Sequence, residues 1–309
     1  MLPMTHASGD PTPVPVGDLR GGIWAGRDPY AGAVLVDGSG DGSLEDWGRW
    51  PARIAGCGAT VLAHDKPGCG PSPGDWRQQT LDDRARETLT AVDVLRARTT
   101  GPVGLVGFSQ GGWVALLAAA HAPSRVDFVV TISGPGVGPA RQERARIARE
   151  LATLDTRADG LAWVDERARR LASGEDPAAV LRAQRELAGR PWYSAVTASF
   201  DTEADLRFLG SLLTFDPAEV LPSVHCPVLA LFGAADPLVP VAASVQAYLT
   251  HLPALPGIAV LPGADHGLFT AAPDPGVDRD SQLAPGFLPL LTGFLTRPAG
   301  PAPEPTSAG

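Results

Sequence analysis

Cysteine and lysine are scarce in this chain of 309 residues. The three cysteines, Cys57, Cys69 and Cys226, are an odd number and include no Cys-x-x-Cys pair. This set excludes a disulfide framework and a zinc site built on paired cysteines. Reduced thiols are typical of the cytoplasm, and no basic segment followed by an apolar run opens the chain. We therefore expect a cytoplasmic protein.

Basic patches and long apolar runs are also missing. The 25 lysine and arginine residues are outnumbered by 34 acidic ones, which gives a net charge of −9. A nucleic-acid surface needs a basic stripe, and the longest apolar run, residues 113–120, is far too short to cross a bilayer. We expect no nucleic-acid or membrane partner, no metal and no organic cofactor. No motif indicates an oligomeric state.

What the chain does contain is a series of short apolar runs that alternate with helical patterns. Each run is apolar on both faces, as in a parallel sheet covered by helices on both sides. Each ends in a loop with Gly, Asp, His or Ser, and ligands bind at such carboxyl ends. An α/β fold with a mostly parallel sheet flanked by helices is therefore predicted. The runs are residues 33–36, 60–63, 103–108, 128–132, 228–232 and 258–261.

The alternation stops between residues 137 and 222, where no strand pattern occurs. Three helices rich in Arg, Ala and Glu are predicted there, at 141–154, 160–173 and 177–188. We interpret this segment as a helical cap inserted into the core. The predicted organisation is an extended N-terminal arm (1–18), a core (19–136 and 223–296), the helical cap (137–222) and a disordered tail (297–309). Further helices are predicted at 80–98, after a variant capping box, at 111–120 and at 241–252.

A nucleophile elbow is predicted at Gly107-Phe108-Ser109-Gln110-Gly111. The Gly-x-Ser-x-Gly pattern alone is weak in a glycine-rich chain. Here it follows a predicted strand and opens an apolar helix, which is the context that an elbow requires. The serine hydroxyl would stand above the sheet, near a helix N-terminus that favours developing negative charge. We expect Ser109 to be the nucleophile.

A serine needs a histidine as base and a carboxylate to orient that histidine. Of the six histidines, His266 follows the last predicted strand and satisfies the chain order Ser…Asp…His of this fold. Asp236 directly follows the preceding strand and is the predicted acid, with a helix-cap role as its alternative. His64 is interpreted as a structural neighbour. Asp265 is interpreted as a loop carboxylate, because it is adjacent to His266 and cannot easily reach its ring.

Acyl transfer also needs donors for an oxyanion. The backbone N–H of Gln110, next to the nucleophile, is one predicted donor. The N–H of Ser39, in the glycine-rich loop 37–42 after the first predicted strand, is the other. This loop lacks the Gly-Lys-Ser/Thr ending of a phosphate-binding P-loop.

The chain from Gly32 to about His266 resembles the α/β-hydrolase superfamily and is similar to capped bacterial serine esterases of the acylaminoacyl-peptidase and acyl-thioesterase branches. The resemblance implies that fold, with an inserted helical cap. The family usually has His-Gly where this chain has Asp37-Gly38, which affects the organisation of the oxyanion loop. The matching segments are residues 34–40, 65–70, 74–76, 107–113, 133–136, 226–233 and 262–266.

The residues together predict a serine hydrolase that cleaves a carboxylic ester of a small or medium acyl substrate through an acyl-enzyme. A thioesterase, a lactonase and a peptidase with the same triad are alternatives, as is a non-hydrolytic enzyme or ligand sensor with this fold. Trp113, Trp192 and Tyr193 are candidate substrate-binding residues, because large rings suit the walls of an apolar pocket. The alternative is that Trp113 occupies a buried helix position and that Trp192 and Tyr193 fill the core of the cap.

Overall fold

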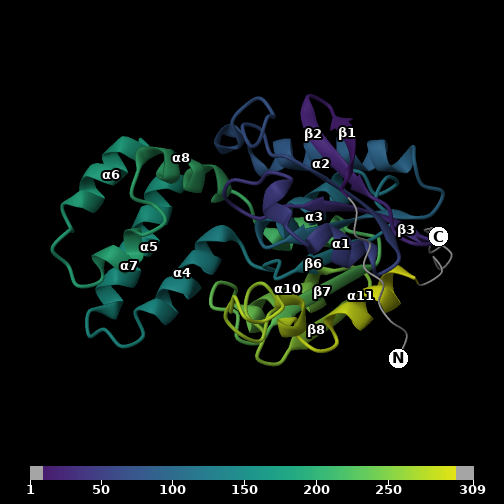
Figure 1. Cartoon of the computed structure of the whole chain (residues 1–309). Coiled ribbons are helices and arrows are strands. Elements are labelled where there is room, and N and C mark those ends of the chain that lie inside the picture. The colour runs from purple at the N-terminus through teal and green to yellow at the C-terminus, as the bar shows by residue number, and fades with distance from the viewer. Residues whose placement is uncertain (1–9, 297–309) are drawn as a thin grey trace, which may run out of the picture.

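The computed structural model describes residues 10–296, which form a single eight-stranded sheet with helices on both faces and a helical lobe beside it (Figure 1). The strand order is β1-β2-β4-β3-β5-β6-β7-β8. The pairs β1–β2 and β2–β4 are antiparallel and the other five pairs are parallel. The mostly parallel sheet confirms the predicted fold class. The strands are β1 Thr12–Val16, β2 Leu19–Trp24, β3 Ala31–Val36, β4 Ala59–His64, β5 Val103–Phe108, β6 Val129–Ile132, β7 Val228–Gly233 and β8 Gly257–Leu261.

The central strands are apolar on both sides because each face of the sheet has its own hydrophobic layer. In β3, Val34 belongs to one layer and Leu35 to the other. The first layer includes side chains of α2 (Leu81–Arg96), α3 (Gln110–His121) and α10 (Val241–His251). The second includes side chains of α1 (Trp50–Ala55) and α11 (Phe287–Leu295). This arrangement holds the carboxyl ends of β3 and β5–β8 together at one edge.

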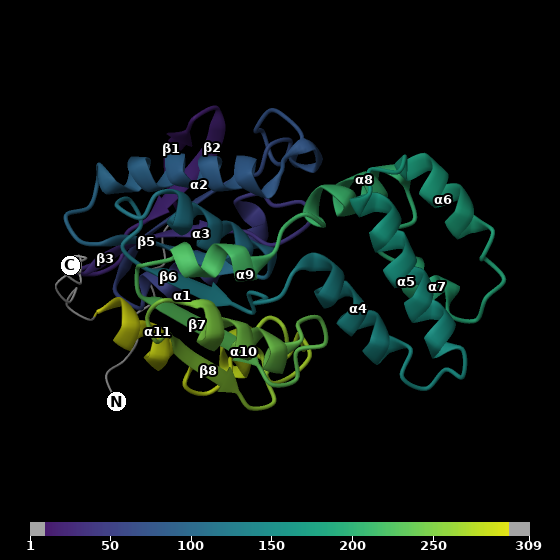
Figure 2. The ribbon, with the colours of Figure 1, turned by 180° about the vertical axis from the view of Figure 1, so that it is seen from behind.

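Six helices lie between β6 and β7, within the segment 137–222 that was predicted as a cap. Figures 1 and 2 show that α4–α8 project from the sheet as a lobe. The lobe has two small hydrophobic cores of its own, one around Ile147 and Trp192 and one around Val180 and Leu206. The helices are α4 Pro139–Glu150, α5 Arg157–Ala172, α6 Pro177–Arg185, α7 Tyr193–Thr197, α8 Glu203–Leu212 and α9 Pro217–Val220.

The structure differs from the sequence prediction at the N-terminal end of the core. Part of the predicted extended arm forms β1, which pairs with β2 at the sheet edge. Pro13 and Pro15 lie in β1, and an edge strand tolerates proline because one side of it needs no ladder bonds. Residues 1–9 of the arm and the predicted tail 297–309 lie outside the described residues. Within residues 10–296, no helix is long and apolar enough to cross a membrane.

Candidate active site

The loop between β5 and α3 is a strained turn with Ser109 at its apex. Ser109 has φ 50° and ψ −119°, a conformation that non-glycine residues rarely adopt. The flanking glycines are needed for space. A Cβ on Gly107 would lie 2.3 Å from the Gly111 oxygen, and one on Gly111 would lie 2.1 Å from the Val36 oxygen. The Ser109 N–H donates to Ile132 O over 2.9 Å, which ties the turn to β6.

Asp236 and His266 form a hydrogen-bonded pair. The His266 Nδ1 lies 2.8 Å from Asp236 Oδ2. The Asp236 carboxylate is fully buried, and its Oδ1 accepts the N–H groups of Leu238 and Val239. These charge-assisted bonds offset the cost of burying the carboxylate. About a quarter of the His266 side chain is exposed (24%), so its ring is accessible from outside the core. Asp236 therefore bonds to the His266 ring and to N–H groups of its own loop, while the helix-cap alternative is wrong, because the N-cap of α10 is Pro240.

Neighbouring Asp265 makes no bond to the His266 ring. Its Oδ1 accepts the N–H groups of Gly267 and Phe269, each over 2.9 Å. This is the loop role predicted for it. His64 lies in the core, where its Nδ1 is 2.9 Å from Asp65 O and 3.8 Å from Glu87 Oε1.

The candidate residues reach one edge of the sheet because they follow four consecutive strands in its order. Ser109 follows β5, Ser133 follows β6, Asp236 follows β7 and His266 follows β8. Ser133 links the end of β6 to β7 and to the loop that carries His266. Its N–H donates to Leu231 O in β7, and its hydroxyl donates to the main-chain oxygen of His266, each over 2.8 Å.

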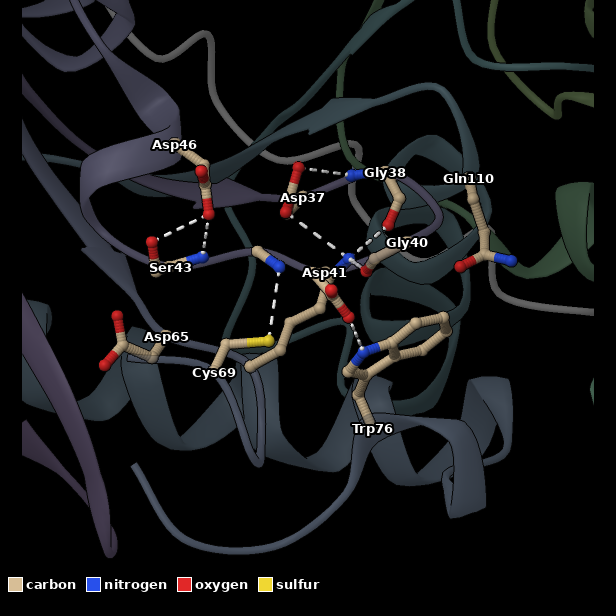
Figure 3. Close-up of polar contacts among 12 residues, drawn as sticks. Asp37, Gly38, Gly40, Asp41, Ser43, Asp46, Asp65, Cys69, Trp76 and Gln110 are labelled. Atoms are coloured by element: carbon tan, nitrogen blue, oxygen red, sulfur yellow. Dashed lines mark hydrogen bonds and ion pairs between the residues drawn. The ribbon is translucent and has the colours of Figure 1, made fainter. Parts of the chain in front are cut away.

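The predicted oxyanion loop lies beside the elbow. A Cβ built on Gly38 would be 3.4 Å from the Ser109 Cβ. Ser39 follows in the loop and is exposed. Gln110 begins α3, so its N–H has no partner inside the helix and is available to a ligand. The Gly38 N–H donates to its own neighbour, Asp37 Oδ1, over 2.7 Å (Figure 3).

Two buried cations, which sequence reasoning missed, hold this loop from beneath. The Lys66 Nζ donates to Gly38 O (2.7 Å) and Gly40 O (2.6 Å) and lies 3.3 Å from Asp37 Oδ2. Arg84 donates to Asp37 O and to Gln110 Oε1, each over 2.7 Å. Burial lowers the pKa of Lys66 to about 8 and also lowers the pKa of Arg84. The only available signal was that the single lysine follows the second predicted strand.

The three aromatic candidates lie away from this edge or in hydrophobic cores. Trp113 is buried in α3, donates its indole N–H to Pro135 O over 2.8 Å and packs against Phe215. Trp192 is buried in the first lobe core, and Tyr193 packs against that core half-buried. These positions favour the core-filling interpretation for Trp113 and Trp192.

The sheet order, the serine turn between β5 and α3 and the acid–histidine pair after β7 and β8 define the α/β hydrolases as a class. The model of the alpha/beta hydrolase family matches residues 21–279, and the chain belongs to this family.

Two relatives are similar in sequence. RutD of Variovorax paradoxus, whose name assigns it as a carbamate hydrolase, is 30% identical over 222 residues, which is 67% of this chain and 75% of RutD. The esterase Rv0045c of Mycobacterium tuberculosis is 32% identical over 109 residues, covering 35% of this chain and 34% of that protein.

Solved structures share the fold. The proline iminopeptidase of Mycobacterium smegmatis has a TM-score of 0.56 at 20% identity, over 92% of this chain and 97% of that one. Est1E of Butyrivibrio proteoclasticus, solved with ferulic acid bound, has a TM-score of 0.54 at 16% identity, over 92% and 96%. At these identities the likeness extends to the fold alone, because one fold hosts many activities.

Proposed function

We propose that the protein hydrolyses carboxylic esters of small or medium acyl groups, with Ser109 as nucleophile, His266 as base and Asp236 as orienting acid. The observation that supports this most strongly is the hydrogen bond between the buried Asp236 carboxylate and His266, on the same sheet edge as the strained serine. A carboxylate on Nδ1 fixes the imidazole tautomer and leaves Nε2 to accept a proton.

In the proposed reaction, the Ser109 oxygen attacks the ester carbonyl while His266 Nε2 takes the hydroxyl proton. The N–H groups of Gln110 and Ser39 stabilise the oxyanion. The C–O bond of the ester then breaks, and the alcohol leaves with the proton from His266. Water, deprotonated by His266, attacks the acyl-enzyme, which releases the carboxylic acid and restores the serine hydroxyl.

We favour an ester over other carbonyl compounds as the substrate because one relative carries the name of an esterase. A carbamate is the second candidate, since RutD, the relative matched over the longer span, is named for that activity. Both substrates need the same attack on a carbonyl carbon, so the residue roles do not change. Thioesters, lactones and peptides remain chemically compatible with the same triad.

The assignment of the nucleophile is tested by covalent labelling. A fluorophosphonate should modify Ser109, identified by peptide mass spectrometry, and Ser109→Ala should abolish both labelling and turnover of nitrophenyl esters. The loss in kcat should be on the order of 10⁶-fold, as in other serine hydrolases. Ser281→Ala is the matched control, because Ser281 lies exposed in η4 (Arg279–Gln282) and bonds only to Asp278 O through its hydroxyl.

Normal turnover by a folded Ser109→Ala variant would contradict the proposal. The substrate class is tested separately, with matched acetyl, butyryl and octanoyl nitrophenyl esters, the corresponding thioesters and a nitrophenyl carbamate. We expect the highest kcat/KM with one of the two shorter esters. A preference for the carbamate would support the second candidate.

A further inference from the structure

The peptide that joins Gly38 to Ser39 is held by two cations on its carbonyl side. The Gly38 oxygen accepts hydrogen bonds from the Lys66 ammonium (2.7 Å) and the Arg84 guanidinium (3.3 Å). Both cations are buried, at 2% and 6% exposure of the whole residue. A buried cation is costly unless it is paired, so two of them at one carbonyl call for an explanation beyond packing. Figure 3 shows Gly38 and Gly40 close together in this loop, beside Asp37.

The planarity of the peptide transmits this contact to the other side of the loop. In a trans peptide the C=O and N–H groups point in opposite directions, and the described residues contain no cis peptide bond. Cations that hold Gly38 O therefore direct the Ser39 N–H away from themselves. A Cβ built on Gly38 would lie in van der Waals range of the Ser109 Cβ, at 3.4 Å. A cation on the oxygen also polarises the peptide and strengthens its N–H as a donor.

We propose that Lys66, with Arg84, is a positioning residue for the oxyanion hole, because it orients and polarises the Gly38–Ser39 peptide toward the oxyanion on Ser109. This inference rests on the proposed hydrolase function and extends it. Lys66 does not touch the substrate. It acts through the peptide.

Asp37 completes this arrangement. Its Oδ1 accepts the Gly38 N–H and its Oδ2 lies 3.3 Å from Lys66 Nζ. The same carboxylate thus neutralises part of the lysine charge and removes the Gly38 N–H from the set of free donors. A Cβ on Gly42 would collide with Asp37 Oδ2 at 1.9 Å, so the compact loop depends on glycine there.

The charges around Lys66 come from every segment packed against it. Asp37 follows β3, Arg84 lies in α2, Cys69 lies in the loop after β4, and the Asp46 carboxylate in η1 (Glu45–Trp47) is within electrostatic range. The ring of Trp76 in η2 (Trp76–Gln78) covers the ammonium at 5.4 Å. Burial and the Arg84 charge disfavour the protonated lysine, while Asp37 favours it, and the pKa of Lys66 falls to about 8.

A merely structural lysine and a positioning lysine predict different kinetics. Lys66→Met should lower kcat about 10- to 100-fold, less than the loss of a whole oxyanion donor, and change KM by less than about threefold, because the interaction develops in the transition state. Binding of an alkylboronic acid, which forms a tetrahedral anion on a serine, should weaken by a similar factor. Lys66→Arg should recover most of both losses.

Arg125→Met is the matched control. Arg125 also pairs with an acid, Asp93, and donates to a main-chain oxygen, that of Leu89, but it lies far from the loop in sequence and makes no contact with it. Thermal unfolding of each variant separates a lost fold from a lost charge. A folded Lys66→Met enzyme with unchanged kcat and unchanged boronate affinity would overturn the proposal.

The wild-type enzyme supplies a second readout that needs no variant. Because Lys66 is the only lysine, protein labelled with ¹³C-lysine gives one side-chain Cε signal, whose titration reports this group alone. We expect the boronate anion to raise that pKa by at least about one unit, and kcat/KM of the free enzyme to fall at the pKa measured without ligand. A titration unaffected by boronate would overturn the proposal even if Lys66→Met fails to fold.

The labelling results distinguish failure of the proposed hydrolase function from failure of the Lys66 proposal alone. If fluorophosphonate and ester both leave Ser109 unmodified in the wild type, the proposed hydrolase and this inference fall together. If wild type is labelled and Ser109→Ala is inactive while the Lys66 readouts stay flat, only the inference falls.

Discussion

The guanidinium of Arg149, in α4 of the lobe, is hydrogen-bonded to the main-chain oxygen of Asp236, the predicted triad acid. The two groups are 3.3 Å apart, and the same guanidinium donates to Pro237 O over 2.9 Å and Val239 O over 3.1 Å. One exposed arginine therefore ties the helical insertion to the loop that carries the acid.

We expect Arg149→Met to lower kcat several-fold through a looser Asp236 loop. The change in the free energy of unfolding should stay below about 1 kcal/mol, because exposed charged contacts contribute little. Arg144→Met is the control, since Arg144 lies on the same helix but pairs with Asp165 inside the lobe. Steady-state kinetics with a nitrophenyl ester would test this, and equal kcat for the two variants would argue against coupling through Arg149.

The backbone strain at Ser109 predicts an unusual order of stabilities. Glycine adopts positive φ without steric cost, whereas alanine keeps the strain of the serine, which is about 1–3 kcal/mol for such a conformation. Ser109→Gly should therefore be more stable than Ser109→Ala by about 1 kcal/mol, after the entropy of the glycine in the unfolded chain is subtracted.

Urea denaturation of both variants measures this difference directly. The control pair is Ser281→Gly and Ser281→Ala, since Ser281 lies in a short helix, where glycine should be the less stable replacement. If alanine is the more stable replacement at both positions, Ser109 is not strained.

Asp236→Asn should preserve the fold and nearly abolish catalysis. The amide oxygen can still accept the N–H groups of Leu238 and Val239, but an amide NH₂ facing His266 Nδ1 favours the wrong tautomer. The loss in kcat should be about 10⁴-fold, as for this change in other triads. Asp265→Asn is the neighbouring control and should retain most of the activity, because the Asp265 carboxylate contacts loop N–H groups and Arg279 but not the His266 ring. Comparable losses in the two variants would contradict the assignment.

The sequence predicted all the parallel strands, including β8 at one edge of the sheet, and missed the antiparallel strands β1 and β2 at the other edge. The run before Ser109 was recognisable because the valine, leucine and phenylalanine side chains of β5 pack into the hydrophobic layers on the two faces of the sheet. In β1 and β2, by contrast, proline and glycine interrupt the apolar pattern, and pairing with the neighbouring strand compensates for the weak local preference.

The same division applies to the candidate site. The pairing of Asp236 with His266 followed from chain order, because each residue comes directly after a strand. The hydrogen bonds from Lys66 and Arg84 to the Gly38 oxygen could not be predicted from the sequence, since these residues are 28 and 46 positions away along the chain. Only the packing of α2 and the loop after β4 beneath the end of β3 brings these cations together.

The lowered pKa of Lys66 has a consequence for stability that does not depend on catalysis. Burial brings this pKa to about 8 in the folded chain, from its ordinary value of 10.5. Between these values the unfolded chain binds more protons, so stability rises with pH, by about 1.4 kcal/mol for each unit of pKa difference.

Burial also raises the pKa of Cys57, and it raises that of Cys226 to about 11, which acts in the opposite direction above pH 9. Both thiols are present in Lys66→Met, so their effect cancels in a comparison. The unfolding free energy of wild type minus that of Lys66→Met should therefore be larger at pH 10 than at pH 7, as measured by urea denaturation. A difference that stays constant would show that Lys66 titrates alike in the folded and unfolded chains.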